Sequence, residues 1–147
     1  MTKFTFNGDI QPDIREAVLT ILEFWAWVIP AWVYEIHIKV YAASEGDELA
    51  SIRVHYDYRE CGIDIIAGWL TRPRDERYRM LLHELLHIPV GLVSDFARDN
   101  FRRLCPEDEA PKFREALIQE LTTRCESATQ DLTIAIFDKH YVRETNG

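Results

Sequence analysis

Positions 83 to 87 read HELLH, a run that strongly restricts how this chain can fold. Two histidines four residues apart lie on the same side of a helix or of a strand, but only an α-helix brings them within one turn of each other, close enough to share an ion. Leucines surround the histidines at positions 81, 82, 85 and 86, and they favour that conformation. In a helix, His83 and His87 can bind one zinc ion, and Glu84 can act as general base on a metal-bound water. The sequence therefore predicts a helix and a metal site near the middle of the chain.

The segments before this run predict one helix followed by three strands. Pro12 suits the first turn of a helix, and apolar residues recur at helical spacing to about position 28. Alternating apolar and polar residues then predict strands at 33–41 and 50–58, and an apolar run predicts a third strand at 62–70. These strands are expected to form a small sheet with one wet side and one side against the core.

Two details of this sheet follow from the alternation. His37 and His55 fall on the polar sides of the first two strands, where plain solvent-facing residues are expected rather than ligands. The run SEGD at positions 44–47 predicts a hairpin turn between the same two strands.

The segments from position 71 onward predict three helices. Thr71 or Asp75 can cap the helix that carries HELLH, and Pro89 is expected to end it. A shorter helix is predicted at 95–104, and a long helix is predicted from Pro111 to Phe137 after a solvated acidic loop at 106–110. The order of elements predicts an α+β fold in a single domain over residues 1–147.

The long helix has an expected apolar face and an expected end. Its apolar stripe is predicted to consist of Leu117, Leu121, Cys125, Ala128 and Leu132. His140 and Tyr141 lie beyond the predicted end of the helix and are expected in a frayed tail.

Composition excludes some classes of function. The net charge of −8 and the lack of a basic cluster argue against nucleic-acid binding, which depends on Lys and Arg. Three widely spaced cysteines without a C-x-x-C pair indicate reduced thiols. The N-terminus lacks a basic region followed by an apolar core, so a cytoplasmic location is expected. The apolar segment 17–33 is short for a bilayer, and Glu23 and Pro30 interrupt it, so no membrane span is predicted.

A catalytic zinc commonly takes three protein ligands, and HELLH supplies two of them. A third histidine in the H-E-x-x-H-x-x-G-x-x-H pattern is excluded, because positions 90 and 93 are both valine. The predicted long helix offers glutamates instead. With Leu121 as the centre of its stripe, Glu120 lies about 100° to one side and Glu126 about 140° to the other. Helical periodicity alone therefore does not choose between Glu120 and Glu126.

The chain resembles the short gluzincins, small zinc metallopeptidase-like proteins often encoded by phages and prophages. The similar stretches are 50–70, 80–87 (MLLHELLH) and 124–132 (RCESATQDL). The resemblance implies a minimal zincin-like domain with an N-terminal helix, a short sheet whose last strand borders the cleft, and a later helix that supplies a glutamate. It also implies Glu126 as third ligand, because Ala128, Thr129 and Leu132 follow it in the family's pattern.

These observations predict a zinc-dependent peptidase in which His83, His87 and Glu126 hold Zn²⁺ and Glu84 is the catalytic base. The expected partner is a peptide or protein substrate, bound as an added strand along a free edge of the strand at 62–70. Two alternatives stay open: a catalytically inactive zinc-binding domain that acts through protein–protein interaction, and a metal-free interaction domain. The sequence predicts neither the substrate nor the oligomeric state.

Overall fold

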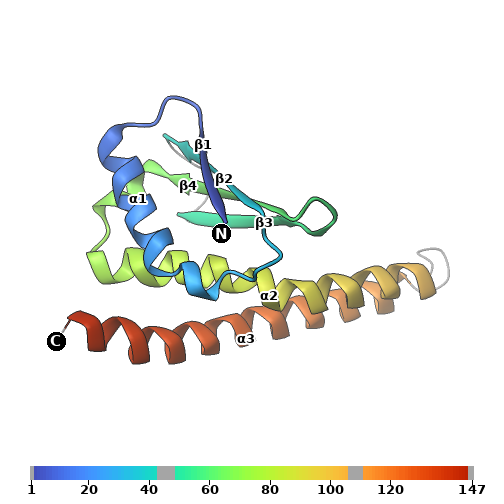
Figure 1. The fold of residues 1–147 in the computed structure, drawn as a ribbon. Helices are drawn as coiled ribbons and strands as arrows, with labels where there is room; N and C mark the ends of the chain where they lie inside the picture. The colour runs from blue at the N-terminus through green and yellow to red at the C-terminus, as the bar shows by residue number, and fades with distance from the viewer. Residues whose placement is uncertain (1, 43–48, 106–110, 146–147) are drawn as a thin grey trace. The chain divides into compact units, whose positions relative to one another are not determined.

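The computed structural model describes residues 2–42, 49–105 and 111–145 (Figure 1). Across these ranges the chain forms three α-helices and one four-stranded mixed sheet, so the predicted α+β class is confirmed and the predicted number of strands is wrong. The chain divides into two compact units, Met1–Ile88 and Pro89–Gly147. The predicted single domain stays a prediction, and the predicted turn at 44–47 and acidic loop at 106–110 lie outside the described residues.

The first unit contains the whole sheet. Its elements, in chain order, are β1 (Lys3–Asn7), α1 (Pro12–Phe24), a short 3₁₀ turn (Ala26–Val28), β2 (Glu35–Tyr41), β3 (Ala50–His55), a second turn (Tyr56–Tyr58), β4 (Glu60–Ile66), a third turn (Ala67–Thr71) and the first part of α2 (Arg74–Leu104). Pro12 occupies the start of α1, as predicted, and the helix ends at Phe24, short of the predicted position 28.

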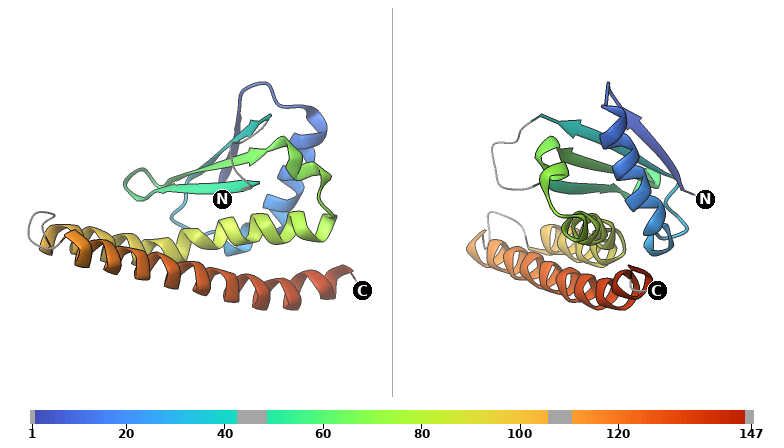
Figure 2. Two further views of the ribbon diagram at one scale, coloured as in Figure 1. Left: turned by 180° about the vertical axis from the view of Figure 1, so that it is seen from behind. Right: turned by 90° about the vertical axis from the view of Figure 1, so that its left-hand side faces the viewer.

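The strands pair in the order β1-β2-β4-β3, with β1, β2 and β4 parallel and β3 antiparallel to β4. Figure 2 shows the sheet from two further directions as one twisted layer. The predicted hairpin between the first two predicted strands is wrong, because β4 lies between β2 and β3. The predicted free edge on the third strand is also wrong, because β4 pairs on both sides. In the described sheet the outer strands are β1 and β3.

β1 was not expected from the sequence, although its residues alternate. Phe4 and Phe6 stand opposite Ile36 and Ile38 of β2, so they extend the apolar face of the sheet by one strand. A run of five residues close to the N-terminus carries a weak period-two signal. Its pairing partner lies about thirty positions further along the chain, and a local pattern does not reveal such a partner.

The core of the first unit lies on one face of the sheet, as the alternation predicted. Ile36, Ile38, Cys61, Ile63 and Ile65 are all buried, and the register places them on the same face. The residues between them, such as His37 and Lys39, stand on the opposite face. The core is completed by Ile14, Val18, Ile21 and Leu22 of α1, by Trp25 directly after α1, and by Leu81, Leu82, Leu85 and Ile88 of α2.

α2 is longer than predicted, because Pro89 lies inside it and does not end it. The predicted motif helix and the predicted helix at 95–104 are one continuous element. A proline removes one backbone N–H and clashes with the preceding turn at a cost of about 3 kcal/mol, which a long helix can absorb. The boundary between the two compact units falls at this proline.

The start of α2 also differs from the expectation. The backbone N–H of Arg77 donates to the carbonyl of Pro73 at 3.1 Å, so the helix is entered at Pro73. The Thr71 hydroxyl donates instead to the carbonyl of Gly68 at 2.7 Å. Asp75 lies in the first turn, where its charge favours the helix N-terminus.

The second unit contains the rest of α2 and α3 (Pro111–Thr145). α3 continues through His140 and Tyr141, so the frayed tail expected there is wrong, and Tyr141 is buried. The predicted apolar stripe is wrong in its second half, because Ala128 and Leu132 are exposed. The buried face of α3 is instead formed by Thr129, Thr133, Phe137 and Tyr141.

The structure also bears on the predictions about the cysteines and about a membrane span. Cys61, Cys105 and Cys125 are free thiols, and burial raises the pKa of Cys61 to about 12. The segment 17–33 forms most of α1 and the turn after it. Among the described residues, α2 is the one helix long and apolar enough to cross a membrane, with 33% of its most apolar window buried in the protein. That is a weak indication of a span, and the cytoplasmic location stays a prediction.

Candidate metal centre

His83 and His87 come together on α2, one helical turn apart. Their Nε2 atoms lie 3.1 Å from each other, and the two rings meet at 87° with centroids 4.7 Å apart. Two nitrogens bound to one tetrahedral zinc at 2.0–2.1 Å would lie about 3.3 Å apart. The pair therefore fits a shared zinc ion without a change of helix geometry.

Glu84 lies beside this pair. One ligand atom from each of His83, Glu84 and His87 falls within 4.8 Å of the others, and all three side chains are half-buried. A carboxylate at this range from a metal held by the histidines is within reach of a water molecule in the same space. The arrangement thus offers a metal-binding pair and a neighbouring proton acceptor on one helix.

The core holds the motif part of α2 in place. Leu81, Leu82 and Leu85 have no exposed surface, which fixes the rotation of the helix and turns His83 and His87 away from the densest packing. Trp25, at the end of α1, is also fully buried and donates its indole N–H to the carbonyl of Tyr78 at 3.0 Å. These contacts leave the two histidines on a rigid support.

The two candidate glutamates belong to α3 and differ in their surroundings there. Glu120 accepts a hydrogen bond from Arg124 Nε at 2.7 Å on an exposed part of the helix. Glu126 lies in the middle of the face that carries Thr129, Thr133, Phe137 and Tyr141, since a 100° step places each of these within about 60° of it. Glu120 lies about 120° from that centre. Glu126 itself is exposed.

The sequence reasoning missed a second group that could hold a metal, formed by Glu35, His37 and Glu60 of β2 and β4. Glu35 and His37 could have been noticed, because they alternate on the polar side of one strand. Glu60 was missed because the third strand was predicted to begin at position 62. A hydrogen bond from the Thr5 hydroxyl, and then the Lys3 ammonium, hold the pKa of Glu35 below its usual range.

Comparison with protein-family models, curated proteins and solved structures finds no match to this chain. The resemblance to the short gluzincins therefore stays a prediction from the sequence, and so does the zinc that it implies.

Proposed function

We propose that this chain is a zinc-dependent peptidase of the gluzincin type. The observation that carries the proposal is the 3.1 Å separation of the His83 and His87 Nε2 atoms on one face of α2, with Glu84 beside them. Two histidines that can bind a metal and a carboxylate that can act as base thus lie within about one turn of a helix that the core holds rigidly.

The chemistry divides between the metal and the chain. A zinc ion held by the histidines would act as a Lewis acid and make a water molecule acidic enough to attack a carbonyl at neutral pH. Glu84 would accept a proton from water in this space and would deliver it to the amine that leaves. His83 and His87 must stay neutral to bind metal, because a protonated imidazole has no free electron pair at the coordinating nitrogen.

We propose Glu126 as the third ligand. Two observations support this choice. The stretch 124–132 resembles the gluzincin pattern, and Glu126 lies at the middle of the face of α3 that carries the buried side chains. Glu120 lies away from that face and is engaged by Arg124. A peptide substrate would extend the sheet along β3, which is the antiparallel outer strand of the described sheet.

Replacing His87 by Ala should remove one zinc ion per chain, because two ligands on adjacent helical turns act together and one imidazole alone binds weakly. The measurement is metal analysis after equilibrium dialysis against micromolar Zn²⁺. His140→Ala is the matched control, since it removes a helix histidine outside the motif. If His87→Ala kept the zinc content of the unaltered chain, HELLH would not be a zinc site.

Glu126→Gln should weaken binding of the same zinc by tenfold or more, whereas Glu120→Gln should leave it unchanged. A ligating carboxylate contributes both charge and a coordinate bond, and the amide supplies neither to the same degree. Competition with a chromophoric chelator measures both affinities. The reverse result, with loss in Glu120→Gln only, would transfer the role of third ligand to Glu120.

A non-catalytic zinc-binding domain that contacts another protein is the second candidate. The observation that favours it is an exposed apolar run on α2 after the proline, where Val93 is 71% and Phe96 73% exposed. Apolar side chains gathered in this way commonly mark an interaction surface. This candidate predicts zinc binding without hydrolysis of any peptide in a broad library, and the same absence of activity in Glu84→Gln.

A further inference from the structure

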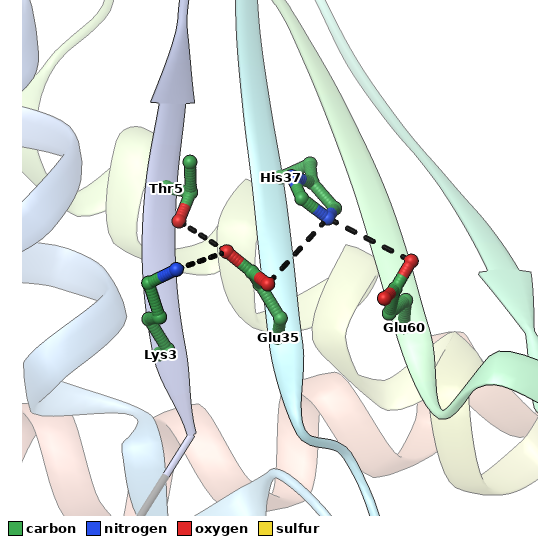
Figure 3. A network of polar contacts seen from close by, with 5 residues as sticks. All are labelled: Lys3, Thr5, Glu35, His37 and Glu60. Carbon is green, nitrogen blue, oxygen red and sulfur yellow. Dashed lines mark hydrogen bonds and ion pairs between the residues drawn. The ribbon is translucent and has the colours of Figure 1, made fainter.

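The polar face of the sheet carries a histidine between two carboxylates (Figure 3). The register of β2 and β4 sets Glu35 directly opposite Glu60, and His37 follows Glu35 by two positions on the same face. Like charges opposite each other on neighbouring strands destabilise a sheet unless a cation lies between them. The Lys3 ammonium already lies beside Glu35, and a cation that Glu35 and Glu60 share would offset the remaining repulsion between them.

The hydrogen bonds that Glu35 accepts from side chains of the described residues both go to one of its two oxygens. Its Oε1 atom accepts hydrogen bonds from the Lys3 ammonium at 2.9 Å and from the Thr5 hydroxyl. The Oε2 atom is directed to His37, whose Nε2 lies 3.9 Å from it and 3.7 Å from Oε2 of Glu60 (Figure 3). The Glu35 side chain is only 12% exposed, so its position is fixed before any ligand arrives.

The distances within this group suit a shared ion better than direct hydrogen bonds. Separations of 3.7 and 3.9 Å exceed the range of an N–H···O hydrogen bond. Two ligand atoms that share a metal at about 2.0–2.2 Å lie roughly 3.0–3.6 Å apart, depending on coordination number. A rotation of the Glu60 side chain, which is 40% exposed, would shorten its 3.7 Å separation from His37. The 3.9 Å separation from Glu35 would close by a rotation of the His37 ring, which is 34% exposed.

The surface beside the group has room for an ion and its water. Gly62 stands next to His37 in the register, and a hollow of about 230 Å³ lies over it, bordered by His37, Glu60 and Asp64. The Asp64 carboxylate pairs through Oδ2 with the Arg53 guanidinium at 2.5 Å, and Arg53 also borders the hollow. The Oδ1 atom of Asp64 is buried and lacks a hydrogen-bond partner among the described residues. A buried acceptor of this kind is normally satisfied by a ligand or an ordered water.

We propose that Glu35, His37 and Glu60 form a second metal site, which binds a divalent transition-metal ion independently of HELLH. One imidazole and two carboxylates suit zinc or manganese, whereas magnesium and calcium prefer oxygen ligands alone. The ion would join β2 to β4 and replace the repulsion between the two glutamates by a shared bond. Water and the Asp64 side of the hollow would complete its surroundings.

The test counts zinc in chains that lack the HELLH pair. His83→Gln/His87→Gln should still bind one Zn²⁺ per chain in equilibrium dialysis, and Zn²⁺ should raise its Tm, whereas Mg²⁺ should not compete. Adding His37→Gln should abolish both effects. Adding Glu60→Gln, at a more exposed position, should weaken binding tenfold or more and guards against a folding defect in the His37 variant.

His55→Gln is the matched control, because His55 stands opposite Glu60 on the same face but is not among the three grouped ligands. It should keep the zinc. The proposal is overturned if the HELLH double variant binds no zinc, if His37→Gln leaves its binding unchanged, or if His55→Gln loses the ion equally. The peptidase proposal fails by a separate result, which is that the HELLH double variant binds as much zinc as the unaltered chain.

Discussion

Glu84→Gln is expected to lower the rate of peptide hydrolysis by about 10²–10⁴-fold, the usual contribution of a general base. Glutamine keeps the shape of the side chain but cannot accept the proton of the attacking water. The zinc content should stay equal to that of the unaltered chain, because Glu84 is not proposed as a ligand. Quenched fluorescent peptide libraries measure the rate, and metal analysis measures the zinc.

The matched control is Glu76→Gln, which removes an exposed carboxylate from the first turn of the same helix. It should leave the rate within about twofold, because it alters the charge of α2 without touching the group around His83. Loss of zinc from Glu84→Gln would show that Glu84 is a ligand and not the base. Equal activity in Glu84→Gln and the unaltered chain would falsify the catalytic role.

Local patterns predicted the helix around HELLH well, because the information lies within a few residues. Histidines at positions i and i+4 and the leucines beside them act over one turn of the helix. The predicted end of the helix at Pro89 is wrong for the same reason. A proline is read locally as a stop, whereas the structure continues the helix to Leu104 through the favourable residues on both sides of it.

The sheet shows the limit of what a local sequence pattern can predict. Alternation placed Ile36 and Ile38 on the core face and His37 on the polar face, and the structure has them so. The order of strands depends on pairing between distant segments, so the neighbours of β4 were not readable from its own residues. The Glu35, His37 and Glu60 group depends on that order, because two adjacent strands supply its members.

The buried face of α3 differs from the predicted one, because apolar residues alone do not define it. Thr129 and Thr133 are buried, and each hydroxyl donates to the carbonyl four residues earlier, at 2.9 Å and 2.7 Å. A threonine that satisfies its hydroxyl within its own helix can be buried like valine. The buried face of α3 is therefore not centred on Leu121. Glu126 lies at the middle of this face, and Glu120 lies away from it.

Trp25→Ala is expected to lower the free energy of unfolding by about 3–5 kcal/mol, the cost of truncating a large buried aromatic side chain. The Trp25 side chain is fully buried, packs edge-on against Phe24 with centroids 4.6 Å apart, and donates to the Tyr78 carbonyl. Alanine leaves a cavity between the end of α1 and the start of α2. Urea unfolding followed by circular dichroism gives the difference.

Trp27→Ala is the control, because Trp27 lies two residues away, in the short turn that follows Trp25, and is 56% exposed. It should cost less than about 1 kcal/mol, since most of its surface is already in water. Because Trp25 supports the helix that carries His83 and His87, folded Trp25→Ala should also bind zinc less tightly than Trp27→Ala. Equal losses of stability in the two variants would mean that α1 does not hold α2 through this indole ring.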